Sequence, residues 1–260
     1  MQAWITLAAA AVLGLALIYL LFIVPSKWLK IEHVHHSLGL GVRILQISDL
    51  HVDMLRITPL RIQEIIARCQ PDFILLTGDY TYKASYLPRL NTYLSAMHSS
   101  LIPTYAVLGN HDHDLPSLKQ LRNLFKEHHV ALLQNAAVEL ESFWLVGIDN
   151  FSTGHSRVEK AFRRLPREPG KKVIVMTHDP NIVLSMKRPY SYLMAGHLHG
   201  KQLNIPYFYK LKPKGPLPAL GIYKGLHHHK WGTYYISKGI GQAGVNARFM
   251  VRSEVTVHDL

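Results

Sequence analysis

The segment VRILQISDLH, residues 42–51, contains the first strand signal and the first polar cluster of the chain. Its first part, Val42–Ser48, is an apolar run that predicts a strand, and Asp49 and His51 follow where this strand ends. The same order returns twice: Phe73–Thr77 (FILLT) precedes Gly78-Asp79, and Thr104–Leu108 (TYAVL) precedes GNHD at 109–112. These repeated pairs of an apolar run and a polar cluster predict strands whose ends gather polar side chains.

Amphipathic stretches between these runs predict helices. The first begins at Thr58-Pro59, because threonine caps a helix and proline suits its first turn. The others span about Leu87–His98 and the residues after Pro116. Five further strands are expected at Phe143–Ile148, Lys172–Met176, Tyr192–Ala195, Thr233–Ser237 and Glu254–Val257. Alternation in the first half implies parallel pairing and the strand-rich tail implies antiparallel additions, so the predicted fold class is α/β.

Polar clusters also follow two later strands, as Thr177-His178-Asp179 and as GHLHG at 196–200. Ligands of α/β proteins bind where strands end. A lone Asp or His in such a place can be a helix cap or a core residue, but five clusters with the same placement predict a shared site. Asp and Asn oxygens mixed with imidazole nitrogens suit two divalent ions, such as Mn²⁺, Fe²⁺ or Zn²⁺, which can activate a water for attack on phosphorus. The single cysteine excludes a disulfide scaffold and a thiolate zinc site.

In this order the five clusters resemble those of the calcineurin-like metallophosphoesterase superfamily, over roughly Val42 to Gln202. The resemblance implies a four-layer β-sandwich flanked by helices. It also implies two sets of metal ligands, Asp49, His51 and His199 for the first ion and Asn110, His178 and His197 for the second, with Asp79 bridging the two. His111 would be the acid, or the group that orients the phosphate, without binding a metal. Asp112 either sets the tautomer of His111 or is a loop carboxylate.

Four longer sequence motifs resemble those of a subgroup of small, membrane-anchored bacterial phosphoesterases. They are ISDLH, THDP, GHLHG and the C-terminal SKGIGQAGVNARF (237–249). Some members of that subgroup hydrolyse UDP-2,3-diacylglucosamine. The chain departs from the subgroup at Lys201, where a second glycine is common, and this cation could hold a substrate phosphate or point to solvent. Arg248 is a second substrate-binding candidate, because a guanidinium grips phosphate oxygens in bidentate fashion; the alternative is a surface arginine.

The longest apolar run lies at the N-terminus. Ala3–Val24 contains neither a charged residue nor a proline, and at 1.5 Å per residue it reaches roughly 33 Å, enough to cross a bilayer core of about 30 Å. We expect an uncleaved anchor over residues 1–26 and a phosphoesterase domain over residues 27–260, rather than a cleaved signal peptide, because no Lys or Arg precedes the run. Since Lys27, Lys30 and Arg43 follow it, the positive-inside rule predicts a cytoplasmic domain. Together with the resemblance to membrane-anchored bacterial phosphoesterases, this implies a single-pass protein of the bacterial inner membrane.

The net charge of +12 is distributed unevenly. Residues 1–154 hold 11 Lys and Arg against 12 Asp and Glu, whereas residues 155–260 hold 18 against 5. Such a basic half suits an anionic membrane surface, nucleic acid or a phosphorylated substrate, and a solubilising face is the alternative. Three other segments are expected in loops: 33–36 near the headgroups, Lys210–Pro218 as a proline-rich basic loop, and the histidines 227–229 in solvent.

The leading interpretation is a two-metal hydrolase of a phosphoester or pyrophosphate, acting on a phosphorylated and lipid-linked substrate such as UDP-2,3-diacylglucosamine. One alternative is a phosphodiesterase that acts on nucleotides or nucleic acid, which would bind with a steep salt dependence. Another is a non-catalytic protein of the same fold, in which some of the metal-binding residues would be replaced by residues that cannot bind a metal. The membrane span argues against nucleic acid as a partner, and every motif position keeps its ligand. The oligomeric state is left open.

Overall fold

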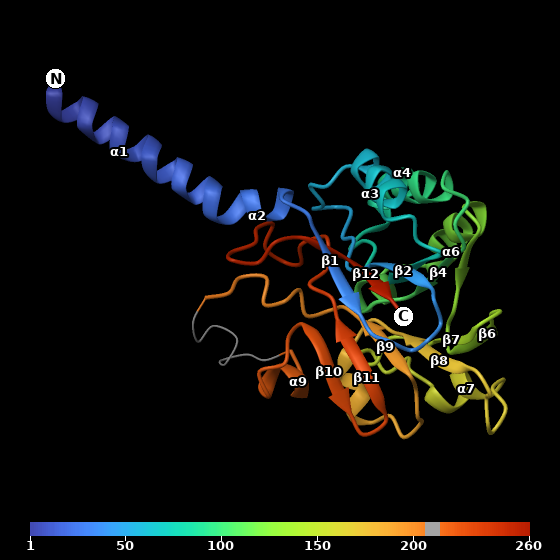
Figure 1. Cartoon of the computed structure of the whole chain (residues 1–260). Coiled ribbons are helices and arrows are strands. Elements are labelled where there is room, and N and C mark those ends of the chain that lie inside the picture. Colours follow the sequence, from blue (N-terminus) through green and yellow to red (C-terminus); the bar gives the residue numbers. More distant parts are fainter. Residues whose placement is uncertain (206–213) are drawn as a thin grey trace.

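The computed structural model describes residues 1–205 and 214–260 and contains two six-stranded sheets packed face to face (Figure 1). The first sheet has the strand order β1-β12-β2-β3-β4-β5. Its strands are β1 (Lys30–His35), β12 (Glu254–Asp259), β2 (Arg43–Ile47), β3 (Phe73–Thr77), β4 (Thr104–Val107) and β5 (Val130–Leu132). Strands β2 to β5 are parallel, and β12 joins them antiparallel, with Thr256 opposite Gln46.

The second sheet has the strand order β10-β11-β9-β8-β7-β6. Its strands are β10 (Gly225–His229), β11 (Gly232–Ile236), β9 (Tyr192–Ala195), β8 (Lys172–Met176), β7 (Phe143–Gly147) and β6 (Ala136–Glu139). The four central strands are parallel, whereas the edge strands β10 and β6 pair antiparallel with β11 and β7. Of the strands predicted in the tail, β12 pairs antiparallel with β2, whereas β11 pairs in parallel with β9 and antiparallel with β10.

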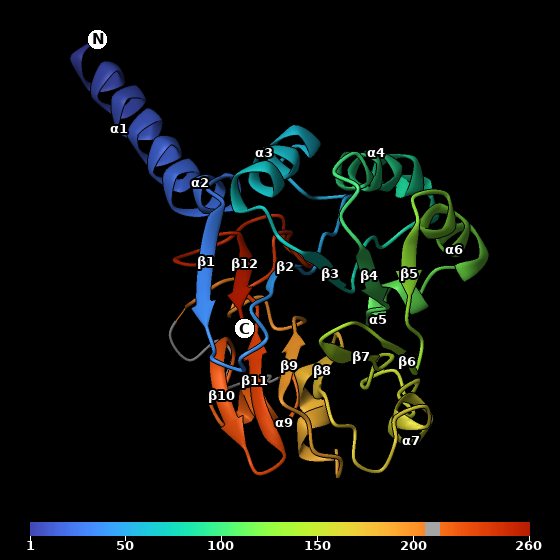
Figure 2. The same cartoon turned by 45° about the vertical axis from the view of Figure 1, so that its right-hand side comes forward.

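Helices cover the outer faces, which makes four layers (Figure 2). On the first sheet lie α3 (Pro59–Cys69), α4 (Leu87–His98) and α6 (Leu118–Glu127), with the short turn η2 (Ala84–Tyr86) leading into α4. On the second sheet lie α7 (Val158–Phe162), η3 (Pro180–Leu184) and α9 (Pro216–Ala219). One buried apolar cluster fills each outer interface, and a third, which includes Leu75 and Leu145, lies between the sheets. The predicted four-layer α/β sandwich is confirmed.

Local sequence accounts well for the first-half helices. In α3, the Thr58 hydroxyl accepts a hydrogen bond from the Arg61 amide at 3.2 Å, and Pro59 occupies the first turn, as expected of a capped helix start. The buried stripe of α3 consists of Ile62, Ile65, Ile66 and Cys69, while Leu60 is exposed. Every strand predicted from an apolar run is present to within two residues.

Strands without an apolar run were missed. The segment containing His33 and His35 is not a connector but strand β1, which pairs in parallel with β12. The histidines 227–229 lie in edge strand β10 and not in a solvated loop, because pairing with β11 fixes them in extended backbone. The prediction for Lys210–Pro218 is partly wrong, since Pro216 begins the short helix α9; residues 210–213 lie outside the described residues.

The N-terminal helix stands away from the sandwich over most of its length (Figure 1). It comprises α1 (Gln2–Ile18), the π-helical segment η1 (Tyr19–Ile23) and α2 (Val24–Lys27), and is long and apolar enough to cross a membrane. Its last turns pack on the domain. The carbonyls of Phe22 and Pro25 accept hydrogen bonds from the amides of Arg248 at 2.9 Å and Ser253 at 3.0 Å, and the Phe22 ring stacks on Phe249 at 4.9 Å. The division at residue 26 stays a prediction, and the helix end is bound to the domain that follows.

We expect a chain that begins at residue 27 to be less stable than one that begins at residue 20. The shorter chain loses the contacts of Phe22, Pro25 and Ser26, and with them about 3 kcal/mol of net hydrogen bonding and packing. For a domain of this size that corresponds to a melting temperature roughly 5–10 °C lower. Thermal unfolding of both fragments in the same detergent measures the difference, and equal melting temperatures would show that the helix end contributes no stability.

Candidate metal centre

Strand ends from both sheets converge on one site. Asp49 and His51 follow β2, Asp79 follows β3 and Asn110 follows β4, while His178 follows β8 and both His197 and His199 follow β9. Because parallel strands present their carboxyl ends at the same edge, seven polar side chains from two sheets meet in one place. A backbone contact ties the halves together: the amide of His197 donates to the Asp49 carboxylate at 3.1 Å.

The backbone of the site is unusual, because five of these seven residues have positive φ. The angles are 56° at Asp49, 38° at His51, 58° at Asp79, 71° at His197 and 48° at His199. Side-chain-bearing residues adopt this left-handed conformation rarely, and it clusters at functional sites. Two glycines permit the close approach: a Cβ on Gly109 would lie 2.1 Å from Asp79 Oδ1, and one on Gly196 would lie 1.8 Å from Ser48 Oγ.

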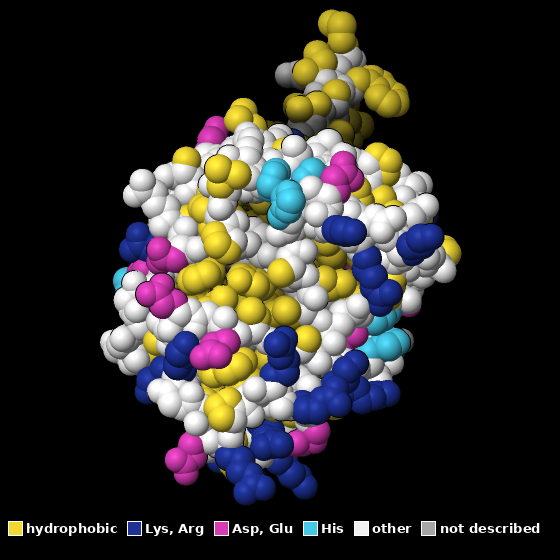
Figure 3. All heavy atoms as spheres, turned by 90° about the vertical axis from the view of Figure 1, so that its right-hand side faces the viewer, with side chains coloured by type: hydrophobic (Ala, Val, Ile, Leu, Met, Phe, Trp, Pro, Cys, Tyr) yellow, Lys and Arg dark blue, Asp and Glu magenta, His cyan; other side chains and the backbone are white. Residues whose placement is uncertain are grey.

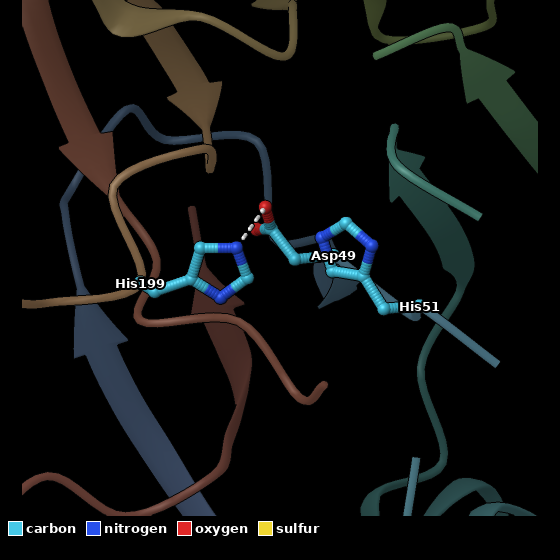
Figure 4. Close-up of side chains that lie close together, drawn as sticks. All are labelled: Asp49, His51 and His199. Atoms are coloured by element: carbon cyan, nitrogen blue, oxygen red, sulfur yellow. Dashed lines mark ion pairs between the residues drawn. The ribbon is translucent and has the colours of Figure 1, made fainter. Parts of the chain in front are cut away.

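The first group of ligands consists of Asp49, His51 and His199 (Figure 4). Their nearest ligand atoms all lie within 4.8 Å of one another, and His199 Nε2 is 3.4 Å from Asp49 Oδ1. All three residues are buried. A carboxylate and two imidazoles around one point form a donor set for a divalent ion.

The second group consists of Asp79, His178 and His197, with Asn110 beside it. His178 Nε2 lies 3.1 Å from Asp79 Oδ2, 3.1 Å from His197 Nδ1 and 3.2 Å from Asn110 Oδ1. Asp79 Oδ2 is also 3.4 Å from His51 Nε2 of the first group. One carboxylate oxygen therefore lies between the two groups, where a bridging ligand would be required.

The residues present fit two metal ions. Within residues 1–205 and 214–260, neither ring nitrogen of His51 has a hydrogen-bond partner, nor has Nδ1 of His199, although all three atoms are buried. Buried polar atoms without partners are costly unless a ligand satisfies them. Burial also lowers the pKa of His51 to about 3 and that of His197 to about 4, which keeps both rings in the neutral form that binds a metal.

His178 differs from the other imidazoles in its charge. Burial by itself would lower the pKa of His178, but the carboxylates of Asp79 and Asp49 raise it to about 10. The ring Nδ1 is held by the Thr77 carbonyl at 2.8 Å, which leaves Nε2 facing the other ligands. The raised pKa favours the protonated form of His178 at neutral pH when no metal is bound.

His111 lies beside the ligands at the wall of a cavity of about 480 Å³. Its amide donates to Asp79 Oδ1 at 2.9 Å, and its ring packs against Tyr82 with centroids 3.9 Å apart. Nδ1 lies 3.3 Å from the Asp114 carboxylate, so Asp114 and not Asp112 pairs with this ring. The sequence left open whether Asp112 sets the tautomer of His111, because it does not show how the short helix α5 (Asn110–His113) turns.

Of the two roles considered for Asp112, setting the tautomer of His111 or bonding to nearby loops, the structure agrees with the second. The Asp112 oxygens accept hydrogen bonds from the amides of Asp79 at 2.9 Å, Tyr80 at 2.8 Å and Gly109 at 2.8 Å. Burial, together with the nearby Asp79 charge, raises the pKa of Asp112 to about 7. This residue joins the ends of β3 and β4 and so sets the positions of Asp79 and Asn110.

Of the lysines and arginines that the structure describes, Lys214 lines the cavity, and the sequence did not single it out. Lys201 does not line the cavity, since its ammonium lies over the Tyr223 ring at 4.4 Å. Asn181 positions the Lys214 segment: its amide donates to the Lys214 carbonyl at 3.3 Å, and its oxygen accepts from Leu217 N at 3.0 Å. Lys214 was one lysine of several in a basic stretch, so only folding distinguishes it.

Arg248 is not a surface arginine, because it is fully buried. Its guanidinium donates to the carbonyls of Lys238, Gly239, Gly241 and Arg252. With its side chain fully buried and bonded to four carbonyls of residues 238–252, Arg248 is not placed as a phosphate clamp, and that prediction is corrected accordingly. Its position braces the loop that connects β11 to β12.

Comparison with known proteins agrees with this site. Residues 42–211 match the model of the calcineurin-like phosphoesterase family. The chain belongs to this family. It is 38% identical over 229 residues to the metallophosphoesterase YkoQ of Bacillus subtilis, covering 84% of this chain and 83% of that one. It is therefore a metal-dependent phosphohydrolase with candidate sites for two divalent ions.

Two more distant relatives carry informative names. The UDP-2,3-diacylglucosamine pyrophosphatase LpxG of Chlamydia trachomatis is 26% identical over 234 residues, which cover 68% of each chain. A transmembrane protein with a metallophosphoesterase domain from Danio rerio is 27% identical over 248 residues, covering 88% of this phosphoesterase and 55% of that protein. These identities support the family and no particular substrate.

We expect metal binding to release a proton from His178. Since the pKa of His178 is raised to about 10, a metal must displace that proton at every pH below it. Between pH 6 and 8 the apparent affinity for Mn²⁺ at the second group should rise about tenfold per pH unit. Titration calorimetry in buffers of different ionisation enthalpy measures the released proton, and His178→Asn should abolish it. An affinity that does not change with pH would contradict the protonated state.

Proposed function

We propose that this phosphoesterase hydrolyses a phosphoester or pyrophosphate bond of a membrane-lipid-linked substrate such as UDP-2,3-diacylglucosamine. The observation that carries the reaction is the position of Asp79, whose carboxylate oxygen lies within 3.4 Å of an imidazole from each ligand group. Two divalent ions held there would polarise a phosphoryl oxygen and lower the pKa of the attacking water. Asp49, His51 and His199 would hold one ion, Asn110, His178 and His197 the other, and Asp79 both.

His111 is proposed as the general acid. The Asp114 carboxylate at Nδ1 fixes the ring orientation, which leaves Nε2 to give a proton to the departing oxygen. The Tyr82 ring contacts both His111 and His51, so it limits the movement of the acid relative to the ligands. Lys214, at the rim, is proposed to bind a substrate phosphate as a point charge.

The lipid-linked substrate is supported by the N-terminal helix and by the likeness to a protein named as a UDP-2,3-diacylglucosamine pyrophosphatase. We propose that the helix anchors the chain in the bacterial inner membrane with the domain in the cytoplasm, because Lys27, Lys30 and Arg43 follow the span. Lys27 Nζ donates to the Tyr19 hydroxyl at 2.9 Å, a pairing that suits the headgroup region.

The basic C-terminal half contributes less to this argument than its charge suggests. Lys160, Arg163, Arg164 and Arg167 are exposed on and after α7. Figures 1 and 2 both show α7 at the end of the sandwich opposite α1, and Figure 3 shows Lys and Arg gathered away from the helix. This cluster therefore does not face the bilayer that the helix would enter.

Replacing Asp79 or His111 should separate metal binding from proton transfer. Asp79→Ala removes the carboxylate shared by both groups, so bound Mn²⁺ should fall below two ions per chain and hydrolysis of an aryl phosphodiester should be lost. His111→Ala should keep both ions and lower kcat about 10²- to 10⁴-fold. Elemental analysis and steady-state kinetics measure both effects. His228→Ala, an exposed histidine of β10, is the control, and full activity in either site variant would exclude the proposed roles.

The two lysines provide a matched test of phosphate binding. Lys214→Ala should raise KM for the aryl phosphodiester about tenfold with kcat nearly unchanged, because one charge-assisted hydrogen bond is lost. Lys201→Ala should leave both constants unchanged, since Lys201 contacts Tyr223 outside the cavity. The opposite pattern would return the phosphate-binding role to Lys201.

The substrate class is tested with detergent-solubilised full-length chain and Mn²⁺. Hydrolysis of UDP-2,3-diacylglucosamine should exceed that of soluble nucleotide diesters by a large factor, because the lipid and the site are brought to the same surface. Equal rates on both would leave the reaction class intact and refute the lipid-linked substrate.

A further inference from the structure

The loop between β11 and β12, residues 237–253, contacts both the N-terminal helix and the metal cavity. At one end the Phe249 ring stacks on Phe22, and the amides of Arg248 and Ser253 donate to helix carbonyls. At the other end Ala243 lines the cavity. Figures 1 and 2 both show this loop, in red, directly beside α2. The loop is thus the physical link between the membrane helix and the site.

Interior hydrogen bonds hold the loop in one shape. The Gln202 side chain donates to the carbonyls of Ala243 at 3.1 Å and Val245 at 2.6 Å, and it accepts from the Ala243 amide at 2.8 Å. The Arg56 guanidinium binds both Asn246 and the Ser26 hydroxyl of the helix end. Because these contacts fix the loop backbone, they also determine which loop side chains are exposed to solvent.

Large apolar side chains of this loop point into solvent. Val245 is 54% exposed and Met250 is 71% exposed, while Val251 beside it is buried. Met250 has a φ of 55°, a left-handed conformation that a methionine rarely adopts and that turns its side chain outward.

At the helix end, Leu21 is 40% exposed and precedes Phe22, whose ring stacks on Phe249 of the loop. Trp28 is 60% exposed and lies under the guanidinium of Arg252 of the loop. We call Val245, Met250, Leu21 and Trp28 the docking face.

We propose that the docking face lies in the interface of a lipid bilayer. The inference rests on the proposed anchoring by the helix: a bilayer crossed by residues 2–27 has its surface at Lys27, and the loop is bonded to the turns just before that residue. The side-chain types agree with such a location. Trp28 carries the Arg252 guanidinium over its ring at 3.8 Å, and an aromatic ring with a basic neighbour is typical of the headgroup region.

This placement would bring the cavity to the membrane surface. Ala243 lines the cavity and Val245 lies two residues further, a distance of at most about 7 Å along the chain. A phosphate attached to a lipid would then reach the ligand groups without leaving the bilayer surface. The proposed substrate class and the docking face are therefore parts of one arrangement, in which the domain is held against the membrane and does not swing on a tether.

The test uses full-length chain in vesicles of phosphatidylcholine and phosphatidylglycerol. Cys69 is replaced by alanine, and a single cysteine is introduced by Val245→Cys or Met250→Cys and labelled with an environment-sensitive fluorophore. The control is Leu101→Cys. Leu101 has a φ of 58° and is 82% exposed, much like Met250, but it precedes β4 and so lies at the other end of the parallel strands. A label at Leu13→Cys, within α1, reports whether the helix is inserted.

Labels at 245 and 250 should be quenched at least twofold by nitroxide-labelled lipid, and the label at 101 should not. If the label at 13 is quenched while those at 245 and 250 resemble that at 101, the domain is tethered but not docked, and the proposal is overturned. If the label at 13 is not quenched, the anchor itself fails and docking fails with it. Hydrolysis of the soluble aryl phosphodiester by the same proteins shows separately whether the proposed chemistry stands.

Discussion

The structure depends on a cluster of buried charged and polar side chains, the candidate metal ligands, which lies where the strand ends of the two sheets meet. Asp49, Asp79 and His178 are all buried. His178 pairs with the Asp79 carboxylate, and the negative charges of Asp79 and Asp49 both raise its pKa. Burying such groups is costly unless each has a partner of opposite charge or a metal. Five ligands also have positive φ, each at a cost of order 1 kcal/mol. The rest of the fold must hold these groups together.

Two features of the sandwich do so. Three apolar clusters hold the strands in place, so that the strand ends of both sheets meet at one edge. Polar braces then join the sheets near that edge: the Gln46 side chain donates to Thr77 Oγ1 and to the Ala195 carbonyl, each at 3.0 Å, and so connects β2, β3 and β9. Asp112 does the same for the loops after β3 and β4. The ligands are therefore positioned by the core and not by one another alone.

The loop of residues 237–253 extends this order to the N-terminal helix. Its start packs on the ligand loop, where the Ile240 and Gly241 amides donate to the carbonyls of Ser48 and Asp49. Its end packs on the helix through Arg248 and Phe249. Arg248 was interpreted as a substrate-binding residue because a guanidinium suits phosphate. In the structure its guanidinium instead donates hydrogen bonds to loop carbonyls, including those of Lys238 and Gly239. The loop thus contacts both the apolar N-terminal helix and the candidate metal site.

Local signals in the amino-acid sequence were enough to predict the α/β class, the first-half helices and the types of candidate ligand, because apolar runs such as Phe73–Thr77 and clusters such as GNHD at 109–112 are read from neighbouring residues. The four-layer sandwich was implied only by the resemblance to the calcineurin-like family. The sequence could not show strand β10, whose histidines have no apolar alternation and are extended only because β11 pairs with them. Nor could it distinguish Lys214 from Lys201, or Asp114 from Asp112, since residues close in sequence point differently once a turn is folded. Those choices depend on where backbone angles direct each side chain, and only the tertiary structure sets those angles.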